Sequence, residues 1–98
     1  THRSRWLLRL LMARIAEQSG KNELAQHLLA ELDVLAATLS LAQWEPELLF
    51  EVRARHLRLL RGKAGRSETE RARLQSQMDR LLADLIAIDP ARAAVLCV

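Results

Sequence analysis

The sequence predicts an all-α fold, a small bundle of about five helices. Half of the 98 residues are hydrophobic, yet only 3% are aromatic, and Leu and Ala supply most of the apolar side chains. Leu and Ala are good helix formers, as are the Arg, Glu and Gln residues of this chain. Apolar residues recur at helical spacing in several segments, and residues that start or stop helices separate these segments. Because the chain is short, we expect residues 1–98 to form a single helical domain.

The first helix is expected over about residues 4–19, and its apolar side chains cover more of the circumference than one stripe would. Either it is the central helix of the domain, or it also contacts another subunit. The second interpretation makes this helix, with the apolar end of the chain, the candidate oligomer interface. The candidate interface residues are Trp6, Leu7, Leu10, Leu11, Arg5, Arg9, Leu96 and Val98.

A second helix should follow the first after a short link. Gly20 is expected to end the first helix in the left-handed conformation, and Asn22 is expected to cap the second. The short link makes the two helices antiparallel, as in a tetratricopeptide-like hairpin. No second copy of this pattern occurs at a fixed period, which argues against a solenoid. The expected apolar stripe is Leu24, Leu28, Leu32, Leu35 and Leu39, with Ala25, Leu29 and Ala36 beside it.

Residues 41–46 form the most distinctive segment, because they contain one of two tryptophans and one of two prolines. Pro46 suits the first turn of a third helix, since it has no N–H to donate and its φ is fixed. Glu45 complements the positive end of the helix dipole. Trp44 is expected either to fold back onto Leu48 or Leu49 as a hydrophobic staple, or to present its ring to a partner.

The third helix is expected over residues 46–61, with Phe50 off its inner face. His56 lies on the inner face and should be a core histidine with its hydrogen bonds satisfied. A glycine loop follows over residues 62–66, and it lacks the order of a phosphate-binding loop. The residues expected to face inward are Leu49, Val52, His56, Leu59 and Leu60.

Two more helices complete the expected bundle. Ser67 and Glu70 form a capping box, which starts a fourth helix that should run to about Ala87. Asp89 and Pro90 begin a short fifth helix, with Asp as the cap and Pro at the first position. The chain then ends in apolar residues, which should dock either on the same bundle or on a neighbouring subunit.

Three motifs, in this order, carry a resemblance to a known family. They are the hairpin sequence around Gly20 and Ala25, the tripeptide Trp44-Glu45-Pro46, and the closing Ile88-Asp89-Pro90. Together they resemble the C-terminal domain of the TssA family of type VI secretion proteins, the ImpA/VasJ-like group, over nearly the whole chain. One departure is the Ile-Asp-Pro ending, where Leu-Asp-Pro is typical of the family.

The resemblance implies a non-enzymatic, cytoplasmic assembly module. Such a domain would self-associate into a ring, stacked rings included, and would support assembly of the baseplate and of the tail tube and sheath. The resemblance also makes Trp44, Glu45 and Pro46 the matches to the family motif and candidate partner contacts. Because the chain begins at Thr1, we expect it to be the C-terminal fragment of a longer protein.

Other classes of function find less support in the residues. One cysteine and three scattered histidines offer neither metal-ligand spacing nor a nucleophile with its base, so we expect no enzyme activity, metal, cofactor or small-molecule substrate. The net charge of +3 is mild and no apolar run could span a bilayer, so we expect neither nucleic-acid binding nor membrane insertion. Two alternatives stay open, a tetratricopeptide-like peptide-binding adaptor and a small helical nucleic-acid binder.

Overall fold

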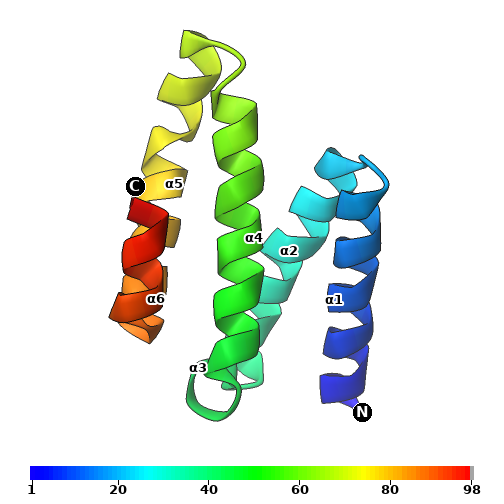
Figure 1. Cartoon of the computed structure of the whole chain (residues 1–98). Helices are drawn as coiled ribbons and strands as arrows, with labels where there is room; N and C mark the ends of the chain where they lie inside the picture. The colour runs from blue at the N-terminus through cyan, green and yellow to red at the C-terminus, as the bar shows by residue number, and fades with distance from the viewer. Residues whose placement is uncertain (98) are drawn as a thin grey trace.

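Two helical hairpins packed side by side make up most of the fold (Figure 1). The computed structural model describes residues 1–97, and it confirms the all-α prediction. One helix more than expected is present in this range, because part of the corner after the second helix is itself helical. The elements are α1 (His2–Gln18), α2 (Asn22–Thr38), α3 (Leu41–Trp44), α4 (Pro46–Ala64), α5 (Glu68–Ile88), α6 (Pro90–Ala94) and a 3₁₀ turn, η1 (Val95–Cys97).

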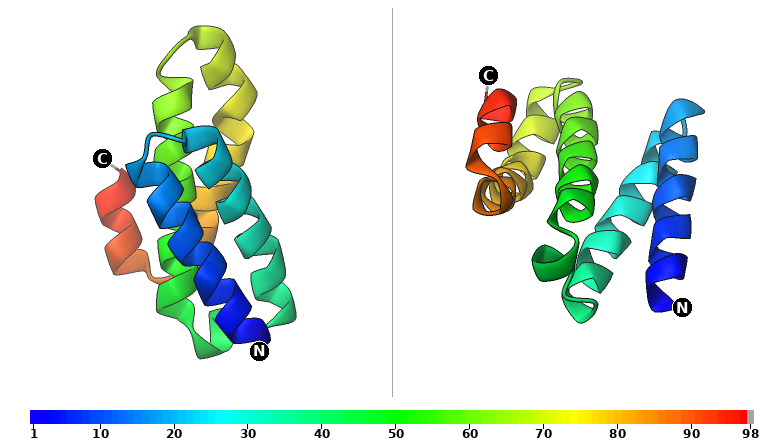
Figure 2. Two further views of the ribbon diagram at one scale, coloured as in Figure 1. Left: turned by 90° about the vertical axis from the view of Figure 1, so that its right-hand side faces the viewer. Right: turned by 60° about the horizontal axis from the view of Figure 1, so that its bottom comes forward.

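The central helix is α4, which packs against α2 on one side and α5 on the other. In contrast, α1 lies at the edge of the molecule, where it packs mainly on α2 (Figure 2). The possibility that the first helix is the central one is therefore wrong. The two hairpins are α1–α2 and α4–α5, and the short helix α3 links them. That the first hairpin is of the tetratricopeptide type stays a prediction.

Buried apolar side chains form two clusters that meet along α4. Because α4 contributes to both, its buried stripe is wider than predicted and includes Phe50 and Leu57. Arg92 of α6 lies over the ring of Phe50, 4.2 Å from its centre, so α6 closes the second cluster. The first cluster comprises Trp6, Leu10, Ala13, Leu29, Leu32, Ala36, Leu41, Leu49 and Val52. The second comprises Phe50, Leu57, Leu60, Ala64, Leu74, Met78, Leu81, Leu85 and Ala93.

The buried stripe of α2 differs from the predicted one. Ala25, Leu29, Leu32 and Ala36 are buried, whereas Leu24 and Leu35 are exposed. The prediction put Leu24 and Leu35 at the centre of the stripe and the alanines beside it, and that was wrong, because the buried side of α2 is centred on the alanines and on Leu29 and Leu32. An alanine side chain lets two helix backbones approach closely, so α2 turns its small residues toward its neighbours and leaves leucines at the margins.

The helix ends follow local sequence signals in most places. Gly20 has φ +76°, as expected of a left-handed residue that ends a helix. Ser67 accepts a hydrogen bond from the Glu70 N–H at 3.1 Å, which confirms Ser67 as the cap of α5, while the Glu70 carboxylate accepts from Arg73. Asp89 accepts one from the Arg92 N–H at 3.1 Å. The prediction for Asn22 was wrong, because Asn22 lies inside the first turn of α2 and its side chain caps nothing.

Ion pairs join the first hairpin to α4. The Arg14–Glu51 pair is bidentate, with nitrogen–oxygen distances of 2.7 and 2.6 Å, and Glu51 also accepts from Arg55. Arg14 and Glu17 are the residues of α1 that form these pairs with α4. The pairs between the first hairpin and α4 are Arg14–Glu51, Arg53–Asp33, Arg55–Glu17, Arg58–Glu17 and Lys63–Glu23.

Candidate protein–protein interface

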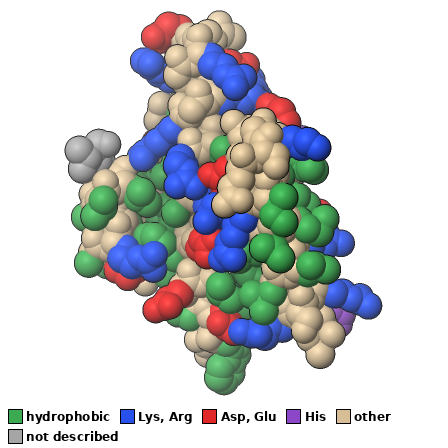
Figure 3. All heavy atoms as spheres, turned by 45° about the vertical axis from the view of Figure 1, so that its right-hand side comes forward, with side chains coloured by type: hydrophobic (Ala, Val, Ile, Leu, Met, Phe, Trp, Pro, Cys, Tyr) green, Lys and Arg blue, Asp and Glu red, His purple; other side chains and the backbone are tan. Residues whose placement is uncertain are grey.

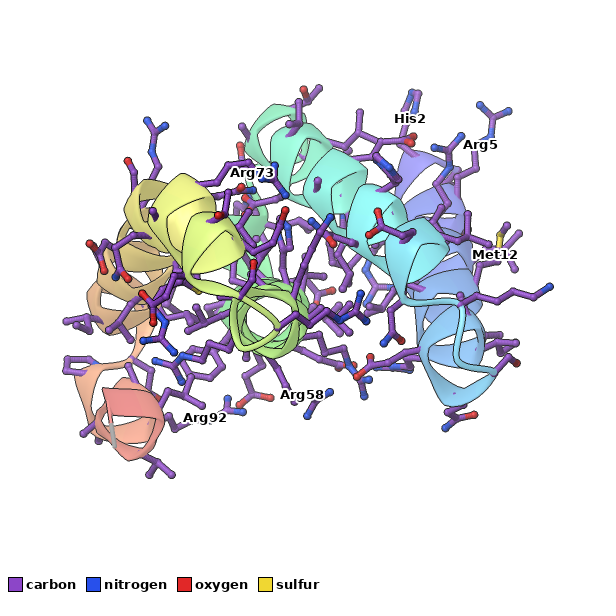
Figure 4. The ribbon with its side chains drawn as sticks, turned by 90° about the horizontal axis from the view of Figure 1, so that it is seen from above. His2, Arg5, Met12, Arg58, Arg73 and Arg92 are labelled. Atoms are coloured by element: carbon purple, nitrogen blue, oxygen red, sulfur yellow. The ribbon has the colours of Figure 1, made fainter. Side chains whose placement is uncertain are left out.

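The outer side of α1 carries four exposed apolar side chains. Leu8, Leu11, Met12 and Ile15 are 58%, 48%, 48% and 53% exposed, and we call them the α1 apolar face. Their spacing of three and four residues places them on one side of the helix, opposite the buried Trp6, Leu10 and Ala13. Figure 4 shows Met12 pointing away from the rest of the molecule. Hydrophobic side chains gather on the side of the molecule that carries α1 (Figure 3).

This arrangement explains why the first helix looks apolar nearly all round in sequence. One side packs in the protein's own core, and the opposite side is about half exposed to solvent. Contiguous exposed apolar patches on soluble proteins commonly mark sites of interaction with other proteins. The α1 apolar face is therefore the main candidate interface.

The residues predicted for an oligomer interface fall in different environments. Trp6 and Leu10 are buried in the first cluster, and the Trp6 Nε1–H donates to the Leu32 carbonyl at 3.0 Å. Leu7 is half-buried against the same cluster, while Leu11 belongs to the α1 apolar face.

The other predicted interface residues are divided between the two sides of the molecule. Arg5 and Arg9 are exposed near the start of α1. Leu96 is half-buried against the second cluster, on the side away from α1 (Figure 1). Val98 lies outside the described residues. The structure thus places Leu96 on a different side of the molecule from the start of α1.

The corner at residues 41–46 presents Trp44 to solvent. Trp44 is the last residue of α3 and is 76% exposed, so the expectation that it folds back onto Leu48 or Leu49 is wrong. The turn of α3 points Leu41 inward and carries the indole outward. Ser40, with φ +55°, sets the direction of this turn. Pro46 is the first residue of α4, as predicted, and Glu45 accepts a hydrogen bond from Arg3 Nε at 2.7 Å.

His56 is buried in the core, but it is not a satisfied histidine. It is 4% exposed, and neither ring nitrogen has a hydrogen-bond partner among the described residues. Burial lowers the pKa of His56, and the nearby Asp33 carboxylate opposes this shift. The sequence could not reveal the missing partners, because they depend on which side chains meet between α2, α4 and α5.

His56 is expected to make the protein less stable in mild acid. Below pH 6.5 the imidazole of the unfolded chain binds a proton, whereas the buried imidazole of the folded chain stays neutral to a lower pH. The free energy of unfolding therefore falls as pH falls. The slope is at most about 1.4 kcal/mol per pH unit. Urea denaturation at several pH values between about 7.5 and 5.5 measures it.

The matched variant is His56→Leu, which removes an unpaired buried polar group while roughly keeping its volume. We expect this variant to be at least as stable as the wild type at neutral pH. Its unfolding free energy should change little over the same pH range. If the unfolding free energy of His56→Leu still changed with pH as steeply as that of the wild type, a titratable group other than His56 would be responsible.

The described residues contain no group of three His, Cys, Asp or Glu side chains that could hold a metal ion. Over the same residues, no helix has the length and apolar character needed to cross a membrane.

Comparisons with known proteins place the chain in a family. The model of a family described as "Type VI secretion, EvfE, EvfF, ImpA, BimE, VC_A0119, VasJ" matches residues 1–56. No curated protein matches the chain.

Two solved structures are similar over nearly the full length. One, described as "EAEC T6SS TssA-Cterminus", is 68% identical, with 99% of this chain and 74% of that chain covered and a TM-score of 0.95. The other, the C-terminal domain of a TssA protein from the type VI secretion system of Escherichia coli, is 69% identical, with 98% and 73% covered. Its TM-score is 0.55.

Proposed function

The chain belongs to the VasJ family of type VI secretion proteins and corresponds to the C-terminal domain of TssA, and we propose that it assembles the secretion apparatus by binding copies of itself. The observation that carries this proposal is the α1 apolar face, four adjacent apolar side chains about half exposed. A structural component of the secretion apparatus explains such a surface better than an enzyme does, because the face has no catalytic groups of its own.

Self-association through this face builds a ring. An edge helix that binds a different surface of the next copy makes a head-to-tail contact, and such contacts close into rings when the rotation between copies permits. In this proposal the ring, alone or stacked on a second ring, acts in the cytoplasm. It supports assembly of the baseplate and the tail tube and sheath, and it carries out no chemical reaction.

The charges of the fold favour protein partners over nucleic acid. Arg14, Arg53, Arg55 and Arg58 are all paired with carboxylates within the chain. A nucleic-acid binder would need such cations free to contact phosphates. The exposed apolar face also favours a structural module over a peptide-binding adaptor, because it lies on the outside of an edge helix.

A substitution on the α1 apolar face tests the proposal in cells. We expect Ile15→Glu, placed in the full-length protein, to prevent sheath assembly, because a buried unpaired carboxylate opposes contact between copies. Imaging of a fluorescently labelled sheath protein measures this. The matched control is Ile86→Glu, a similarly exposed isoleucine on α5. Normal sheath assembly with a folded, expressed Ile15→Glu protein would contradict the proposal.

A further inference from the structure

An exposed tryptophan and an apolar cavity lie at the same end of the molecule. Trp44 projects from the end of α3 with 76% of its surface exposed. The cavity, of about 340 Å³, lies between the start of α1 and the end of α2, directly before α3 in the chain. The cavity is therefore close to the tryptophan but not filled by it.

The cavity has an apolar interior and a cationic rim. Its walls include Trp6, Leu35 and Leu39, and Arg5, Arg9 and His2 lie at its edge. Figure 4 shows His2 and Arg5 extending outward from the start of α1. Arg9 forms an ion pair with Glu31, whereas Arg5 has no ion pair within the described part of the chain.

The tryptophan segment has the complementary chemistry. An indole suits an apolar cavity, and its face is the preferred aromatic surface for an arginine side chain. Glu47, three residues after Trp44, is exposed in the first turn of α4 and has no ion pair within residues 1–97. The apolar ring of Trp44 thus suits the interior of the cavity, and the negative charge of Glu47 suits the positive charge of Arg5 at its edge.

We propose that Trp44 of one copy inserts into the α1–α2 cavity of a second copy, with Glu47 facing Arg5 of that copy. The inference rests on the proposed self-association and adds a contact distinct from the α1 apolar face. Because the tryptophan and the cavity lie at the same end of the chain's fold, a two-fold axis at this end lets both copies insert at once. Trp44, central to the contact and fully desolvated there, carries much of the binding energy.

Analytical ultracentrifugation of three variants tests this contact separately from the α1 apolar face. In the Ile15→Glu background we expect a two-copy species to remain, and adding Trp44→Ala should convert it to a monomer, with Kd raised about tenfold or more. Thr38→Trp, which fills the cavity mouth at an exposed position, should act like Trp44→Ala. Circular dichroism should show all variants to be folded.

A charge exchange tests the orientation of the contact. Arg5→Glu and Glu47→Arg should each weaken the two-copy species, and the double variant should restore it, because the exchanged charges meet between copies. A monomeric Ile15→Glu protein, when the wild type assembles, would overturn the Trp44 contact and leave the proposed function standing. Unchanged association of Trp44→Ala in that background would overturn it too. A wild type that stays monomeric would overturn both.

Discussion

Replacing Trp6 with alanine is expected to lower the free energy of unfolding by about 3–5 kcal/mol, the range typical of removing a large buried aromatic side chain. Trp6 is 2% exposed and lies in the cluster between α1, α2 and α4. Its loss leaves a cavity that the surrounding helices cannot fully close, and it removes the hydrogen bond to the Leu32 carbonyl. Urea denaturation monitored by circular dichroism measures the change.

The control is the other tryptophan. Trp44→Ala removes the same side chain from a position that is 76% exposed, so the free energy of unfolding of a monomer should change by no more than about 0.5 kcal/mol. Comparing the two variants therefore distinguishes Trp6, which stabilises the fold, from Trp44, which is exposed and can contact a partner. Equal losses of stability in both variants would contradict the environments assigned to them.

Replacing Ile15 with glutamate is expected to reduce the mass of the assembled protein to that of a pair of copies. Ile15 is 53% exposed at the end of the α1 apolar face, so the substitution is compatible with the monomer fold. In an assembly the new carboxylate would be buried without a partner, which strongly opposes association. Light scattering coupled to size-exclusion chromatography measures the mass.

Ile86→Glu provides the comparison, since Ile86 is 43% exposed on α5 and has no part in the α1 apolar face. We expect this variant to assemble like the wild type. If Ile86→Glu dissociated the assembly and Ile15→Glu did not, the interface would lie on the second hairpin.

The sequence predicts the helices well because their signals are local. Proline at the start of α4, the Ser67 cap of α5 and the left-handed Gly20 each act within a few residues, so their effects can be read without the tertiary structure. The link at residues 41–44 is different. Its helical turn depends on Leu41 finding a place in the first cluster, which no local pattern reveals.

The side of a helix that becomes buried is harder to predict than the helix itself. In α1 the apolar residues lie on two opposite sides, and only packing on α2 decides that Trp6 and Leu10 turn inward while Leu8 and Ile15 stay outside. The apolar spread nonetheless predicted that part of this helix would be left uncovered by its own chain. The signal for the exposed set was its own spacing of three and four residues between positions 8 and 15.

The central claim is that a second copy of this chain covers the α1 apolar face, and the native mass of the purified chain tests it most directly. Sedimentation equilibrium from micromolar to millimolar concentration should give a mass several times the 11.1 kDa of one copy. A mass of 11.1 kDa that does not change with concentration would contradict the account, because Leu8, Leu11, Met12 and Ile15 would then remain exposed to water.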